Sequence, residues 1–130
     1  MIEKKQIYKC EKCGNLVESL WNGKPAIVCC GQPMTQLEAN TVDASKEKHV
    51  PVIIRQGSRV TVKVGSEPHP MTPQHYILFI EVLSGDQVYR QDFREGAIQA
   101  EAVFTIEDDG QALVARAFCN LHGLWQGQGK

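Results

Sequence analysis

The chain has 130 residues, of which 42% are hydrophobic and 22% charged, the composition of an ordinary globular protein. Its formal net charge of -1 provides no strong field for nucleic acid or an anionic membrane surface. No apolar run approaches the ~18 residues of a spanning helix, and the first residues lack the apolar stretch of a secretion signal. We therefore expect a cytoplasmic protein with no nucleic-acid or membrane partner.

The first predicted domain covers residues 1–36 and holds four of the five cysteines. Short strands are predicted at 7–9 and 15–21, with Asn22-Gly23 as a turn. Domains below ~40 residues usually need a metal, a disulfide or a partner chain for stability. A reducing cytosol disfavours disulfides, and an odd number of cysteines would leave one thiol over. A metal site is therefore the favoured source of stability for this small domain.

The ligands for that site are a C-x2-C pair, Cys10 and Cys13, and the adjacent pair Cys29 and Cys30. Four thiolates from two short segments predict a tetrahedral all-sulfur site for zinc or for a single iron. The spacing does not choose between the two metals. Because a short planar peptide joins the adjacent pair, we expect one distorted sulfur–metal–sulfur angle.

The polar segment 35–45 shows no clear strand pattern, and residues 37–45 are predicted to be a linker. Residues 46–130 then form the second predicted domain. Alternation of apolar and polar residues, interrupted by glycine-containing turns, indicates an antiparallel β-sandwich. The predicted strands are 49–54, 59–64, 75–83, 87–93, 101–106 and 111–118.

All four histidines and the fifth cysteine lie in this second domain: His49, His69, His75, His122 and Cys119. A lone histidine is more often a surface or core residue than a ligand. Here Cys119 and His122 have C-x2-H spacing, and His69 and His75 are close enough to share a site. Four imidazoles and one thiolate are too many for structural zinc. Five ligands leave one octahedral position open, which suits a redox or substrate-binding iron.

The chain resembles desulfoferrodoxin, the two-iron class of superoxide reductase, over essentially its whole length. The resemblance rests on five motifs: YKCEKCGN at 8–15, CCGQPM at 29–34, EKHVP at 47–51, PHPM at 68–71 and CNLHGLW at 119–125. It implies an all-β chain with a small desulforedoxin-like (rubredoxin-like) domain followed by an immunoglobulin-like β-sandwich. It also implies two iron ions per chain, one in each ligand set, and a homodimer.

The activity implied by the resemblance is reduction of superoxide to hydrogen peroxide, a detoxification under oxidative stress. The four histidines would be equatorial ligands and Cys119 the axial one, with electrons supplied by a small redox protein such as rubredoxin. Lys48 would attract the superoxide anion, and Glu47 could bind the ferric iron after product leaves. Both could instead be solvated charges of an ordinary surface segment.

Two other functions remain open from the residues. The chain could be a non-catalytic iron protein that transfers electrons or senses metal. It could also be a zinc-ribbon binding module beside a β-sandwich. Trp125 is expected either to pack near the loop from Cys119 to His122 or to be plain core.

Overall fold

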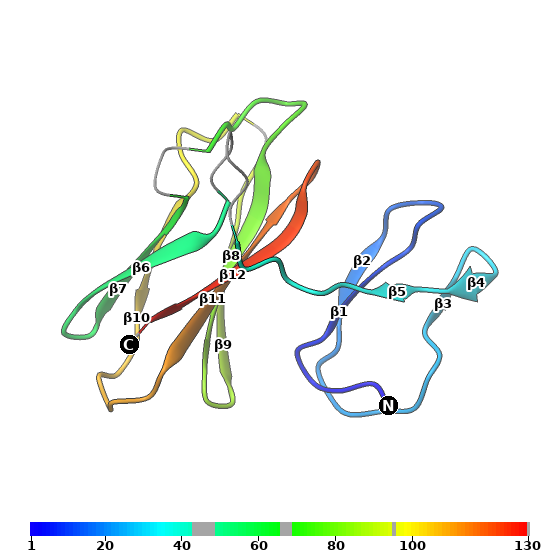
Figure 1. The fold of residues 1–130 in the computed structure, drawn as a ribbon, viewed down its shortest axis with the longest axis horizontal. Coiled ribbons are helices and arrows are strands. Elements are labelled where there is room, and N and C mark those ends of the chain that lie inside the picture. The colour runs from blue at the N-terminus through cyan, green and yellow to red at the C-terminus, as the bar shows by residue number, and fades with distance from the viewer. Residues whose placement is uncertain (43–48, 66–68, 95, 130) are drawn as a thin grey trace. The chain divides into compact units, whose positions relative to one another are not determined.

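The computed structural model describes residues 1–42, 49–65, 69–94 and 96–129. The chain divides into two compact units, Met1–Glu38 and Ala39–Lys130. Every regular element in the described ranges is a β-strand (Figure 1), so the predicted all-β class is confirmed. Within those ranges no helix has the length and apolar character needed to cross a membrane.

The first unit is built from very short strands. β1 (Ile7–Lys9) lies between β2 (Leu16–Glu18) and β5 (Thr35–Gln36) in an antiparallel sheet, while β3 (Val28–Cys29) and β4 (Gln32–Pro33) form a separate hairpin. Four buried residues make its core: Ile2, Tyr8, Cys10 and Met34. So few buried side chains contribute little free energy of folding, because that contribution scales with the apolar area buried.

Two details of this unit differ from the prediction. Residues 35–36 form strand β5, although no strand was expected there, because β5 needs only backbone hydrogen bonds to β1 and both of its side chains are exposed. Gly23 does not turn the chain with Asn22. It instead forms an isolated antiparallel bridge with Ile2.

The second unit consists of two antiparallel sheets (Figure 1). The first sheet has the order β10-β7-β6, with β6 Pro51–Gln56, β7 Arg59–Val64 and β10 Glu101–Thr105. The second has the order β12-β11-β8-β9, with β8 Ile77–Ser84, β9 Gln87–Asp92, β11 Leu113–Cys119 and β12 Gly123–Gly129. The predicted β-sandwich is thus confirmed.

Alternate residues from both sheets make the core of the sandwich. β7 contributes Val60, Val62 and Val64, and the other sheet contributes side chains that include Ile80 and Leu113. Each of these five is at most 2% exposed. The period-two pattern in the sequence therefore marks the inward face of each strand. Cys119 belongs to the same core, and it is the last residue of β11.

Strand β12 was not predicted, because glycines at 123, 127 and 129 lower strand propensity and break the alternating pattern. The structure supplies a reason for two of them. A Cβ atom at Gly127 would collide with the carbonyl oxygen of Pro51, and one at Gly129 would lie 3.1 Å from Cβ of Ile53. Glycine thus lets β12 approach β6 of the opposite sheet.

A charged pair is buried on the other face of the four-stranded sheet. Glu81 on β8 is 0% exposed, and Arg116 on β11 lies directly opposite it in the strand register. Arg116 donates to Oε1 of Glu81 from Nε at 3.1 Å and from Nη2 at 2.6 Å. The two charges can be buried because they neutralise each other and share two hydrogen bonds.

Candidate metal sites

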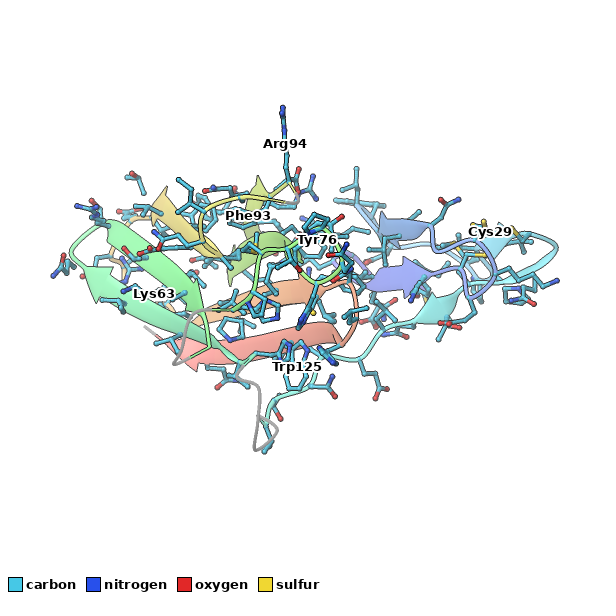
Figure 2. All side chains as sticks on the ribbon, turned by 90° about the horizontal axis from the view of Figure 1, so that it is seen from above. Cys29, Lys63, Tyr76, Phe93, Arg94 and Trp125 are labelled. Carbon is cyan, nitrogen blue, oxygen red and sulfur yellow. The ribbon has the colours of Figure 1, made fainter. Side chains whose placement is uncertain are left out.

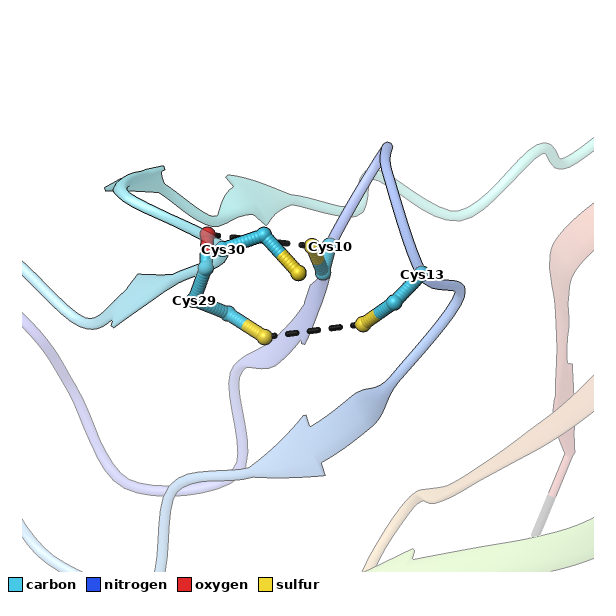
Figure 3. Close-up of side chains that lie close together, drawn as sticks. All are labelled: Cys10, Cys13, Cys29 and Cys30. Atoms are coloured by element: carbon cyan, nitrogen blue, oxygen red, sulfur yellow. Dashed lines mark hydrogen bonds between the residues drawn. The ribbon is translucent and has the colours of Figure 1, made fainter.

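The four cysteines of the first unit converge on one point (Figure 3). Their sulfur atoms all lie within 4.8 Å of one another, and Sγ of Cys13 is 3.6 Å from Sγ of Cys29. Two sulfurs bound tetrahedrally to one ion, each at about 2.3 Å, would be separated by about 3.8 Å. The observed spacing is therefore that of a tetrathiolate site.

Local backbone structure presents these thiols. In the first pair, Gly14 N–H donates to the carbonyl of Cys10 at 2.9 Å, and Cys10 N–H donates to the carbonyl of Asn15 at 2.9 Å. These bonds close a tight knuckle around Cys13. The Asn15 amide nitrogen also lies 3.6 Å from Sγ of Cys29, so it can donate to that sulfur.

The adjacent pair is presented by the β3–β4 hairpin. Cys29 pairs with Gln32, which leaves Cys30 and Gly31 as the two-residue loop. Their φ angles are +52° and +75°, as a type I′ turn requires. Positive φ is unusual for cysteine. The hairpin thereby turns two neighbouring side chains toward the same centre, which an extended strand would send to opposite faces.

The thiols influence one another's ionisation. Hydrogen bonding from the backbone N–H of Cys13 lowers the pKa of the Cys10 thiol to about 6. The Cys13 side chain raises the pKa of Cys29, and it raises the pKa of Cys30 to about 12. The Cys10 thiolate therefore forms readily, while Cys29 and Cys30 resist ionisation. A bound cation would remove that resistance, because it compensates the crowded negative charge. The donor set thus fits a metal ion.

The second set gathers at one end of the sandwich. His49 lies two residues before β6, and His75 lies two residues before β8. Cys119 is the last residue of β11, and His122 lies in the loop between β11 and β12. The donor atoms of these four residues lie within 4.8 Å of one another. Cys119 is fully buried, and its Sγ lies 3.7 Å from Nδ1 of His122.

His69 completes a ring of four imidazoles. Going round this ring from His49 through His69, His75 and His122, neighbouring ring centroids are 4.7, 4.7, 5.0 and 4.9 Å apart. The separation of His49 from His75 is 6.3 Å, longer than any of these sides, as the diagonal of a four-sided ring must be. Four imidazoles arranged in this way can surround one metal ion, as four ligands in the plane of an octahedral site would.

The hydrogen-bonding state of two histidines indicates which of their nitrogens can bind a metal ion. Nδ1 of His69 lies 2.7 Å from the carbonyl oxygen of Pro70, and because a carbonyl only accepts, Nδ1 carries the proton and Nε2 the lone pair. Nε2 of His75 is buried with no hydrogen-bond partner in the part of the chain that the structure describes. A buried polar atom without a partner is costly, and a metal ion would satisfy it. This donor set also fits a metal ion.

Two residues without a predicted ligand role hold the site together. The Asn120 side chain accepts from Tyr76 N–H at 2.9 Å and donates to the carbonyl of Gln74 at 3.0 Å, so it ties the Cys119 loop to the His75 segment. Trp125 contacts both His49 and His122. The prediction that Trp125 packs near the loop from Cys119 to His122 is therefore confirmed, and the indole is buried as well. Glu47 and Lys48, predicted to assist catalysis, lie outside the described residues.

Comparison with known families assigns both units. The family model of the desulfoferrodoxin N-terminal domain matches residues 2–37, and that of desulfoferrodoxin matches residues 41–128. The chain belongs to the desulfoferrodoxin family. The predicted resemblance is thus confirmed, and the chain carries the donor sets of the two iron centres of desulfoferrodoxin.

Individual desulfoferrodoxin relatives align over almost the full length. A desulfoferrodoxin homolog from Archaeoglobus fulgidus is 52% identical, over 97% of this chain and 98% of that protein. Desulfoferrodoxin from Syntrophotalea carbinolica is 49% identical, over 99% and 100%. Among solved structures, the superoxide reductase from Treponema pallidum has a TM-score of 0.75 at 29% identity, covering 98% of this chain and 99% of that one. These likenesses support an oxidoreductase.

Proposed function

We propose that this chain is a superoxide reductase. The observation that carries the proposal is the ring of four imidazoles with a buried thiol beside it in the second unit. Five donors fill all but one position of an octahedral ion, so a small oxygen species can reach the metal. The Treponema pallidum protein of similar fold is a superoxide reductase, and so is a Pyrococcus horikoshii relative that is 39% identical over 66% of this chain.

In this proposal His49, His69, His75, His122 and Cys119 would together hold the iron. The iron, when bound, supplies the single electron that superoxide accepts. Superoxide, one electron and two protons balance to one hydrogen peroxide, so an external donor must return one electron per turnover. A small redox protein such as rubredoxin is the proposed donor. The thiolate raises the electron density at the metal, as it does in thiolate-ligated haem.

The two residues that precede His49 in the sequence would act on the substrate. Lys48, adjacent in sequence to His49, would attract the superoxide anion and orient water for proton delivery. Glu47 would offer the iron a further carboxylate ligand. Both assignments rest on the position of these residues in the EKHVP motif next to His49.

The four-cysteine site would have a different role. Cys10, Cys13, Cys29 and Cys30 fill a tetrahedron and leave no position for a substrate, so we assign its iron to electron storage or relay. We assign residues 1–36 to this domain, 37–45 to the linker and 46–130 to the reductase domain. A homodimer in the cytoplasm is proposed, where reducing conditions keep all five thiols available.

The test is a pulse of superoxide mixed with the fully reduced, two-iron chain. We expect rapid oxidation of the histidine-rich iron and one hydrogen peroxide formed per superoxide consumed. Dismutation would instead give one peroxide for every two superoxide molecules. Redox cycling of iron without rapid peroxide formation would favour the plain electron-transfer alternative.

A zinc-loaded sample of the same chain provides the control. Zinc has no accessible second oxidation state, so it keeps the fold but cannot supply an electron. Superoxide should then decay at the rate of buffer alone. Equal peroxide yields from zinc-loaded and iron-loaded protein would refute the proposed function.

A further inference from the structure

The indole of Trp125 contacts two ligands of the histidine-rich site. Its ring stacks on the imidazole of His49, with centroids 4.7 Å apart and an interplanar angle of 16°. Its Nε1–H donates to the carbonyl oxygen of His122 at 3.1 Å. Trp125 is 8% exposed, and Figure 2 shows it beside the strands of the second unit. One side chain therefore constrains two neighbouring histidines, His49 and His122, in the ring of four imidazoles.

These two ligands come from different sheets of the sandwich. His49 leads into β6 of the three-stranded sheet, whereas His122 lies between β11 and β12 of the four-stranded sheet. Nothing in the local chain fixes the distance between them. The indole joins them, because its face meets one ligand while its edge holds the backbone of the other.

The indole is itself held in place. Trp125 lies opposite Ala117 in the β11–β12 register. The backbone of the residues on either side of it, Leu124 and Gln126, forms hydrogen bonds with Asn40. Asn40 N–H donates to the carbonyl of Leu124 at 2.8 Å, and the N–H of Gln126 donates to the carbonyl of Asn40 at 2.9 Å. One hydrogen bond on each side of Trp125 limits rotation of the strand, so the indole can act as a rigid support.

We propose that Trp125 is a positioning residue that sets the orientation of His49 and His122 toward the iron. It touches no reacting atom. Groups that contact metal ligands from outside typically change metal affinity 10- to 100-fold when they are removed. The proposal rests on iron binding at this site, which is part of the proposed function, but it does not require that superoxide be turned over.

The deciding variant is Trp125→Phe in the full-length, two-iron protein. Phenylalanine preserves an aromatic face for His49 but has no N–H for the His122 carbonyl. We expect the affinity of the histidine-rich site for Fe²⁺ to fall about 10- to 100-fold. We also expect its ferric EPR signal and its midpoint potential to shift. Iron retention against a chelator, EPR and a redox titration measure these effects.

Two internal controls accompany this variant. The four-cysteine iron in the same molecule should keep its signal and its potential. Trp21→Phe removes an indole that is 75% exposed, and it should change neither iron. A Trp125→Phe protein with unchanged affinity, EPR signal and potential at the histidine-rich iron would overturn the proposal. Equal changes at both irons would also overturn it, because they would indicate a general loss of stability.

The iron measurements also separate this proposal from the proposed function. If the parent protein bound iron normally but made no peroxide from superoxide, the function would fail. The response of the histidine-rich iron to Trp125→Phe would still decide whether Trp125 positions the ligands.

Discussion

A single proton determines how His69 can serve a metal. The bond from Nδ1 to the Pro70 carbonyl holds the imidazole in the tautomer that offers Nε2, and it fixes the plane of the ring. In His75 the free nitrogen itself is visible, since its Nε2 is buried without a hydrogen bond among the described residues and is available to a metal ion. Each ligand thus needs one nitrogen committed to the metal and a support that fixes its direction.

At this scale, Lys48 gives a direct test of electrostatic steering. Replacing Lys48 by Ala should lower the second-order rate of oxidation by superoxide and weaken its dependence on ionic strength, because the local attraction of the anion is lost. Pulse radiolysis at several salt concentrations measures both. Lys63→Ala, which removes an exposed lysine from β7, is the matched control and should leave both unchanged. Equal salt dependence in parent and Lys48→Ala would remove the steering role.

Among the elements, the β3–β4 hairpin decides whether two adjacent cysteines can share one ion. Its loop residue Gly31 has a φ of +75°, and a Cβ there would meet no atom within 4 Å. The cost of Gly31→Ala should therefore come from backbone strain alone, about 1–2 kcal/mol. We expect iron in the four-cysteine site to be lost to a chelator about 5- to 30-fold more readily.

Gly23→Ala is the matched control for this hairpin, because Gly23 also has open space but no positive φ. It should leave iron retention nearly unchanged. If the two variants lost iron equally, the left-handed turn would not be what holds the site.

Strand β12 links the packing of the sheets to the histidine-rich site. A Cβ at Gly127 would collide with the Pro51 carbonyl, two residues after His49, and would lie 3.3 Å from Cγ1 of Val50. Gly127→Ala should therefore destabilise the second unit by about 1–3 kcal/mol. Urea unfolding followed by circular dichroism measures this loss.

The adjacent Gln126 supplies the control for that strand. Its side chain lies on the other face of the sheet, since β12 residues alternate in direction. Gln126→Ala should change the unfolding free energy by less than about 0.5 kcal/mol. A Gly127→Ala protein as stable as the parent would show that β12 and β6 can separate without cost.

At the level of the whole molecule, the two units depend on metal to different degrees. The first unit has a core of four buried residues and strands of two or three residues, whereas the sandwich buries a much larger apolar cluster. Structural metal binding contributes directly to folding free energy in such small domains. Chelation of both irons should therefore unfold Met1–Glu38 and leave Ala39–Lys130 folded.

NMR spectra recorded before and after chelation would test this difference. Amide signals of the first unit should collapse to unfolded positions, while those of the sandwich strands should persist away from the iron ligands. Restoring iron or zinc should recover the first set of signals. Persistence of a folded first unit without metal would show that its small core is sufficient.

Much of the sandwich could be predicted because its strands carry local signals. Residues 59–64 alternate apolar and polar side chains, and the observed strand β7 has the predicted bounds. β12 could not be predicted in the same way. Two of its glycines, Gly127 and Gly129, are explained by contacts with Pro51 and Ile53, more than 70 positions away in the chain, and such contacts leave no local pattern.

The sequence by itself determined which residue types were available and how they divide, four thiols in one unit against four imidazoles and one thiol in the other. The four cysteines lie in two short motifs, so their spacing alone predicted the first set, whereas the second set, spread from His49 to His122, was implied by the family resemblance. Only the tertiary structure decided the cyclic order of the imidazoles, the donor nitrogen of His69 and the contact of Trp125 with two ligands. The cyclic order and the contact of Trp125 with His49 arise where two sheets meet, and packing fixes them across long separations in the chain. The bond from His69 to the neighbouring Pro70 is local, but it depends on a side-chain rotamer that the sequence does not show.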